Sequence, residues 1–349
     1  MGIFDCSMEM ASFHNEKVRL KKPEQDAMRS RRNAGRTRLR SGLEKAGFAI
    51  PDFFSQGSYA MHTMVQDDEC DYDIDDGAYF PENGLQDENG TPLDAKASRE
   101  RICRALQQDE RLKEPAEVHT NCVRQKYPEG YHIDVPVYRV KSSERPDGSG
   151  EESIELASNG EWVVSDARGV TGWFNDAVQR ENEKYSDDGQ LRRIVCLTKA
   201  FARSRKEWKK ETCSGIIITR LVVDEFVGVE GRDDQALIDI WKRVRSRLQL
   251  STHVAHPVND GDLASDGDPS VVVFRDKLGY ALDVAKKLSQ DCTRGEARKA
   301  WDEIFNTQHF GNQPDRGNGD NSGGTRAFVG TGEMADRRDD AGGRFGLWE

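Results

Sequence analysis

An acidic segment with the alternation of a β-strand constrains this chain more than any other feature. It reads Asp-Tyr-Asp-Ile-Asp-Asp-Gly over residues 71–77. Successive side chains of a strand point to opposite faces, so we expect Asp73 and Asp75 on one face and Ile74 on the other, toward the core. Two carboxylates about 6 to 7 Å apart along a strand can share a pair of Mg²⁺ ions. The segment therefore predicts a site for metal-dependent phosphoryl transfer.

Two further motifs have residue types that such a site needs. Gly57 and Ser58 lie between a predicted strand and a predicted short helix, where backbone N–H groups and the positive helix end can hold a triphosphate. Asp134 lies in an alternating segment, residues 131–137, whose apolar residues share one face while Asp134 points the opposite way. We interpret Asp134 as the third carboxylate, which would ligate the metal and receive or relay a proton. A solvated strand face would give the same pattern.

Two other metal sites are weaker interpretations. Asp71, Asp73, Asp75 and Glu82 have the spacing of ligands in an EF-hand loop, but Asp76 stands where that loop requires glycine. A zinc site at His253 and His256 lacks a completing set of cysteine or carboxylate ligands. The seven cysteines contain no Cys-x-x-Cys pair, so we expect reduced thiols.

Composition limits the classes of partner. The chain has 349 residues, 51 basic and 62 acidic, with a formal net charge of −11. This balance disfavours broad adhesion to nucleic acid or to anionic membranes, so phosphate binding would need a local basic pocket. No apolar run is long enough for a transmembrane helix, and the start lacks a signal-peptide core. We therefore expect a cytoplasmic protein with no membrane partner and no obligatory nucleic acid.

The pattern of elements predicts an α+β fold with two lobes. A basic helix over residues 24–46 precedes strands near 53–56, 72–79, 118–123 and 131–140, with a helix near 98–107. The pattern is helical from about 167 to 306, whereas residues 311–349 are too poor in apolar side chains to order themselves. We predict a catalytic lobe over 1–160 with a mixed sheet, a helical lobe over 161–310 and a disordered tail over 311–349.

Taken together, Gly57-Ser58, the segment 73–77 and the segment 133–136 resemble the bacterial cGAS/DncV-like nucleotidyltransferases (CD-NTases). Two helical segments extend the resemblance into the second lobe. Residues 191–201 resemble the family helix whose lysine, here Lys199, reaches the donor triphosphate. Residues 214–219 resemble the following helix start, which makes Ser214 a candidate nucleotide contact. Arg124 is a candidate phosphate contact or an ordinary surface partner of a nearby glutamate.

The resemblance implies a polymerase-β-like lobe and an enzyme that links nucleoside triphosphates, ATP and GTP among them, into a cyclic di- or trinucleotide. It implies two Mg²⁺ ions at Asp73, Asp75 and Asp134. It also implies a CBASS antiphage role, in which the product activates an effector and the tail can be a site of conjugation to a partner. Two alternatives stay open: transfer of a nucleotide to an RNA, protein or small-molecule acceptor, and a catalytically silent nucleotide-binding module.

Overall fold

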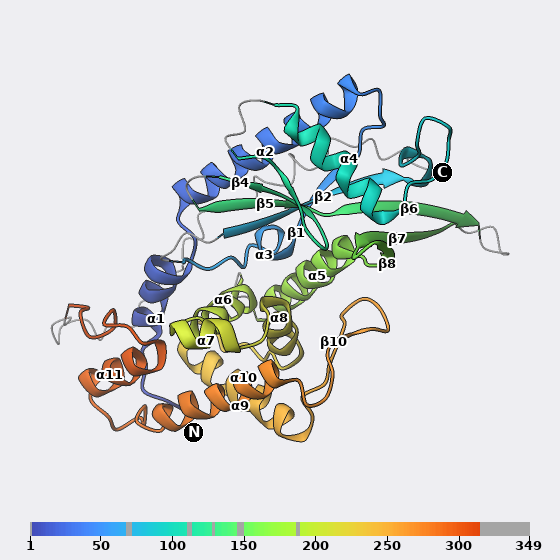
Figure 1. Ribbon diagram of the computed structural model, residues 1–349. Helices are drawn as coiled ribbons and strands as arrows, with labels where there is room; N and C mark the ends of the chain where they lie inside the picture. The colour runs from blue at the N-terminus through green and yellow to red at the C-terminus, as the bar shows by residue number, and fades with distance from the viewer. Residues whose placement is uncertain are drawn as a thin grey trace. The chain divides into compact units, whose positions relative to one another are not determined.

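The computed structural model describes residues 2–67, 72–109, 114–127, 130–144, 150–185 and 189–314 (Figure 1). These residues form two compact units. The sheet unit comprises Lys21–Met61 and the described residues of Asp67–Thr171. The helical unit comprises the described residues of Met1–Leu20, His62–Gln66 and the described residues from Gly172 onward.

A mixed sheet is the centre of the sheet unit. Its strands are β1 (Asp52–Gln56), β2 (Tyr72–Pro81), β3 (Glu117–Val118), β4 (Val123–Lys126), β5 (Tyr131–Val135), β6 (Val137–Glu144), β7 (Gly150–Ser158) and β8 (Glu161–Val164). Strand β2 pairs antiparallel with β1 and parallel with β5 and β6. Because Asp75 pairs with Asp134 and Ala78 with Val137, β5 and β6 follow β2 in a single register, interrupted at Pro136. Strand β4 pairs antiparallel with β5, and β7 with β6.

The alternation in β2 decides which of its faces is buried. Tyr72, Ile74 and Asp76 are buried, whereas Asp73 between them is exposed. Helices α2 (Lys22–Lys45) and α4 (Ala95–Gln107) pack together over the sheet (Figure 1). They cross closely at Gly42, where an added Cβ would stand 2.1 Å from the Ala105 carbonyl oxygen. The short helices α3 (Gly57–Ala60) and η2 (Glu82–Gly84) follow β1 and β2 directly.

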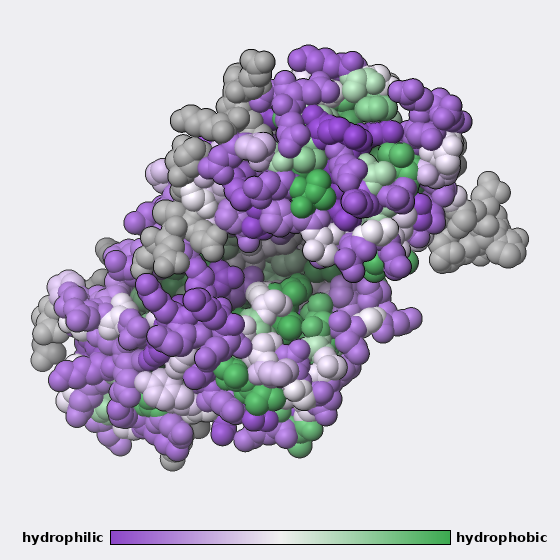
Figure 2. All heavy atoms as spheres, viewed as in Figure 1, coloured by the Kyte–Doolittle hydropathy of each residue, from purple (hydrophilic) through white to green (hydrophobic). Residues whose placement is uncertain are grey.

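The helical unit is a bundle around a large aromatic core. Its elements are α1 (Ser7–Phe13), the π-helical turn η1 (His14–Val18), α6 (Gln190–Ala202), α7 (Lys206–Glu211), α8 (Gly215–Asp224), α9 (Asp233–Leu250), α10 (Pro269–Ala285) and α11 (Arg294–Phe305). Helix α5 (Ala167–Tyr185) begins in the sheet unit and continues into this one. Trp241, Trp301, Phe201, Phe274 and Phe310 are at most 1% exposed. Hydrophilic residues dominate the face seen in Figure 2.

The predicted α+β fold, with a mixed sheet and a helical lobe, is confirmed. Residues 72–81 form a strand, which excludes an EF-hand loop there. The strand expected over 118–123 is instead two strands, β3 and β4, joined by a turn. A hairpin of β9 (Val254–Ala255) and β10 (Asp262–Ala264) interrupts the region expected to be helical, and His253 pairs with Asp262 across it at 2.6 Å.

The division of the chain differs from the expected boundaries in three places. Residues 1–20 belong to the helical unit, and the change between units falls within α5, after Thr171. Residues 311–314, expected in the tail, are held by α11, since Gly311 N–H donates to Asp302 and Arg298 donates to the Gln313 carbonyl oxygen. The rest of the expected tail, 315–349, lies outside the described residues. Among the described helices, none combines the length and apolar character that crossing a membrane requires.

Candidate active site

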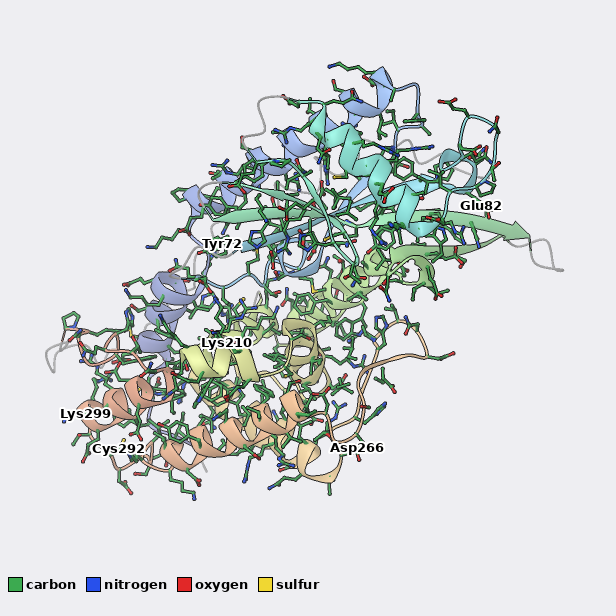
Figure 3. All side chains as sticks on the ribbon, in the orientation of Figure 1. Tyr72, Glu82, Lys210, Asp266, Cys292 and Lys299 are labelled. Carbon is green, nitrogen blue, oxygen red and sulfur yellow. The ribbon has the colours of Figure 1, made fainter. Side chains whose placement is uncertain are left out.

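Three carboxylates share one face of the sheet near the start of β2. Tyr72 and Glu82 mark the two ends of this strand in Figure 3, and Asp73 and Asp75 lie next to the Tyr72 end. In the parallel pairing of β2 with β5, Asp75 is directly beside Asp134 and Asp73 beside His132. Paired residues of neighbouring strands point to the same face. The two strands therefore place Asp73, Asp75 and Asp134 on one face of the sheet.

The environment of Asp75 favours its protonated form when no cation is present. Burial, followed by the negative charges of Asp134 and Asp73, raises the pKa of the Asp75 carboxyl to about 7. Asp75 has no hydrogen-bond or ion-pair partner among the described residues. A partly buried carboxyl facing two others needs positive charge from a partner or a bound ion.

Gly57 borders the same carboxyl. It has a φ of 65°, and a Cβ at this position would stand 2.6 Å from Asp75 Oδ2. A side chain here would be strained by the left-handed backbone and would also displace Asp75. Ser58 follows as the second residue of α3 and is partly exposed. Gly57 and Ser58 thus lie in a helix that contacts β2, the strand that carries Asp73 and Asp75.

Arg124 binds the third carboxylate. It lies directly opposite Asp134 in the antiparallel pairing of β4 and β5. Its Nε and Nη2 donate to Asp134 Oδ1 and Oδ2, each at 2.7 Å, and Nη2 is also 3.7 Å from Asp73 Oδ1. The partner is therefore a carboxylate of the candidate site and not a surface glutamate. His132 Nε2 lies 3.1 Å from Asp73 Oδ1.

The donor set suits Mg²⁺, which prefers carboxylate oxygen. In the part of the chain that the structure describes, however, no three His, Cys, Asp or Glu side chains are gathered tightly enough to hold a metal ion. Both oxygens of Asp134 accept hydrogen bonds from Arg124 instead. The residue types and their common face fit a metal.

Sequence reasoning missed the side chains that fix these motifs. On the α2 side of the sheet, Arg36 holds Asp76 with Nε–Oδ2 at 2.7 Å and Nη2–Oδ1 at 2.6 Å. Gln56, the residue before Gly57, accepts a hydrogen bond from Tyr79 and donates one to Tyr138, both at 3.0 Å. Asp76 is thus a structural anion, and Gln56 anchors the chain where α3 begins.

Lys199 is buried in the helical unit and not on an open surface. It is 4% exposed, its Nζ donates to Thr63 Oγ1 at 2.9 Å, and burial lowers the pKa of its ammonium to about 8. A Cβ on Gly215, the first residue of α8, would stand 3.6 Å from Nζ. Ser214, exposed, is the N-cap of that helix. Lys199, Ser214 and the helix start therefore gather positive potential and donors at one place.

Comparison with known protein families gives a match to the part of the chain that carries the carboxylates. Residues 51–138 match the model of the cyclic GMP-AMP synthase DncV-like nucleotidyltransferase domain. This span contains β1, α3, β2 and β5, and with them the three carboxylates. The chain carries a DncV-like nucleotidyltransferase domain over residues 51–138. This match supports an enzyme.

Solved DncV structures share the fold over both units. The apo form of Vibrio cholerae DncV has a TM-score of 0.65 at 19% identity, over 85% of this chain and 94% of that one. V. cholerae DncV with the linear intermediate 5′ pppA(3′,5′)pG has a TM-score of 0.67 at 17% identity, over 87% and 96%. Escherichia coli DncV bound to 3′-deoxy GTP has a TM-score of 0.63 at 19% identity, over 85% and 94%. The likeness to DncV thus extends beyond the matched domain.

Proposed function

We propose that this DncV-like nucleotidyltransferase joins nucleoside triphosphates into a cyclic di- or trinucleotide, with release of pyrophosphate. The observation that carries the proposal is the pairing of Asp75 with Asp134, which puts three carboxylates on one face of the sheet. A binding module without catalysis has no need of three such groups. The reaction on α-phosphorus would rest on positioning and on neutralisation of charge.

Asp73, Asp75 and Asp134 are the residues that would hold two Mg²⁺ ions. When bound, the metal neutralises phosphate charge and makes a hydroxyl a better nucleophile. The carboxylates orient that hydroxyl toward the phosphorus, and Asp134 is the group we assign to receive or relay its proton. Gly57 leaves the Asp75 carboxyl in its place, because a Cβ there would collide with it.

Lys199 and Ser214 are the residues of the helical unit that we assign to the triphosphate. The ammonium of Lys199 has no carboxylate partner among the described residues, and it lies beside the start of α8. A buried cation at a helix N-terminus is costly without an anion to balance it. Triphosphate would provide that anion.

Cyclisation rests on the likeness to DncV. One of the solved V. cholerae structures is that of a cyclic AMP-GMP synthase in complex with a linear dinucleotide intermediate. By analogy we propose that a linear product stays bound here and that the same carboxylates act on it a second time. ATP and GTP are the substrates we expect first. The antiphage role, an effector that responds to the product, and conjugation through the predicted tail, residues 311–349, belong to the same proposal.

The test is direct. Purified protein is incubated with ATP, GTP, CTP, UTP and Mg²⁺, and phosphatase-resistant products are identified by mass spectrometry. We expect a cyclic product from the wild type and at least a ~100-fold loss in Asp75→Asn, since the carboxylates act as a unit. Glu82→Gln, which removes an exposed acid just beyond the far end of β2, is the matched control and should retain activity.

Other outcomes would favour the alternatives. A product that forms only when RNA, a protein or a small molecule is added would indicate transfer to that acceptor. Nucleotide binding without any product, under every metal tried, would indicate a silent binding module and would contradict the proposal.

A further inference from the structure

Arg124 places its guanidinium between two of the three carboxylates. It makes two hydrogen bonds of 2.7 Å to Asp134 and approaches Asp73 at 3.7 Å. The Asp134 side chain is only 11% exposed, and that of Arg124 is 25% exposed. A two-point contact between planar groups in a partly buried place is among the stronger ion pairs. It is not a loose surface pair.

This contact occupies the positions that a metal needs. A carboxylate accepts through its oxygen lone pairs, and Arg124 engages both oxygens of Asp134. Asp75, paired beside Asp134 in the sheet, has no such partner among the described residues. The guanidinium of Arg124 therefore balances the charge of Asp134, whereas no cation among the described residues pairs with Asp75.

We propose that Arg124 is an internal counter-ion that a divalent metal must displace from Asp134 before the site is complete. This inference rests on the proposed function, which supplies the metal requirement. Arg124 holds the third carboxylate when the metal is absent and releases it when the metal is bound. The released guanidinium stays on the carboxylate face, where the phosphates of a bound nucleotide balance it. Metal and nucleotide consequently favour each other's binding.

Lys126 provides a matched comparison on the same strand. It lies two residues after Arg124 in β4, so it points to the same face with the same charge. Its ammonium pairs with Glu117 at 2.8 Å, outside the carboxylate group. Substitution of Arg124 or of Lys126 by glutamine removes one positive charge from the same strand. Only Arg124, however, competes with a metal ion for Asp134. The pair of variants separates displacement from a general electrostatic effect.

The experiment measures Mn²⁺ binding to the full chain by the loss of the free-ion EPR signal, without nucleotide. We expect Arg124→Gln to bind Mn²⁺ about tenfold more tightly than wild type, because a bidentate pair no longer has to be broken. Lys126→Gln should stay within about twofold. Arg124→Lys keeps the charge but loses the planar two-point contact, so its affinity should fall between wild type and Arg124→Gln. Near-UV circular dichroism checks that each variant is folded.

A second arm adds a non-hydrolysable nucleoside triphosphate. Nucleotide should tighten Mn²⁺ binding at least about fivefold more in wild type than in Arg124→Gln. The reason is that the variant has no guanidinium that can leave Asp134 and pair with the phosphates of the nucleotide. Equal effects of Arg124→Gln and Lys126→Gln on Mn²⁺ affinity would overturn the inference. Asp75→Asn should lose Mn²⁺ binding, and unchanged binding in that variant would instead contradict the proposed function.

Discussion

At the scale of single residues, Asp75 links the stability of the metal-free protein to pH. Its pKa is 3.8 in the unfolded chain and about 7 in the folded protein. Between these values the folded protein binds more protons than the unfolded chain, so the free energy of unfolding falls as pH rises from about 4 to 7. Above pH 7 the loss is complete.

The prediction is that Asp75→Asn is more stable than wild type at pH 8 in EDTA, by about 2 kcal/mol, and that the gain shrinks toward pH 4. Urea unfolding at pH 4, 6 and 8 measures it. Glu82→Gln, a change of the same charge at an exposed position, should show no such trend. A variant less stable than wild type at pH 8 would mean that the three carboxylates do not repel one another.

At the scale of elements, the start of α3 depends on a glycine for two separate reasons. Gly57 combines a φ of 65° with a Cβ position 2.6 Å from Asp75 Oδ2. Gly47, after α2, has a similar φ of 72° but no atom within 4 Å of its Cβ position. The two glycines therefore share a left-handed backbone conformation and differ in their contact with the site.

We predict that Gly57→Ala and Gly47→Ala each lower the free energy of unfolding by about 1–2 kcal/mol, the cost of a left-handed backbone. Only Gly57→Ala should also reduce product formation, by about 100-fold, because it displaces a carboxylate that must be accurately placed. Urea unfolding and the nucleotide assay measure the two effects. Similar activities of the two variants would separate Gly57 from the reaction.

Local patterns predicted those elements whose residues alternate or recur regularly. The alternation around Ile74 gave β2 and the common face of Asp73 and Asp75, and composition gave α2 and α4 within a few residues. The hairpin of β9 and β10 was missed because strands of two or three residues carry no periodic signal.

The partners of the predicted residues could not be found in the same way. The contact of Arg124 with Asp134 depends on the register of β4 against β5, which no local pattern fixes. The burial of Lys199 against Thr63 joins residues far apart in the chain. The residue types of the candidate site could therefore be predicted from the sequence. The side chains that contact them, such as Arg124 at Asp134 and Thr63 at Lys199, could not.

At the scale of the whole molecule, the first twenty residues fold with the helical unit and not with the sheet that follows them. Their backbone is fixed by acidic and amide side chains of α9, since Cys6 N–H donates to Asp234 and Ile3 N–H to Gln235, both at 2.8 Å. Glu9, 3% exposed, pairs with Arg294 and Arg298 of α11. These contacts join residues that lie far apart in the chain. The expectation that residues 1–20 belong to the catalytic lobe rested on their proximity in sequence to the sheet, and the structure differs from it.

Phe13 offers the sharpest test of this assignment. Its ring centre lies 4.6 Å from that of Phe305 and 4.8 Å from that of Phe310, and the residue is 5% exposed. We predict that Phe13→Ala lowers the free energy of unfolding of the helical unit by about 3 kcal/mol, because it removes a large buried side chain and leaves a cavity. Met8→Ala, on the same helix but 56% exposed, should change it by less than about 0.5 kcal/mol.

Tryptophan fluorescence during urea unfolding, measured in a Trp162→Phe background, reads out the helical unit, because Trp208, Trp241 and Trp301 lie there and are buried, whereas Trp162 lies in the sheet unit. The transition of Phe13→Ala should move to lower urea with an unchanged slope, as expected when stability and not compactness has changed. If residues 1–20 belonged to the catalytic lobe, this transition would stay at the wild-type urea concentration and activity alone would fall. That result would indicate that α1 belongs to the sheet unit, as predicted from the sequence.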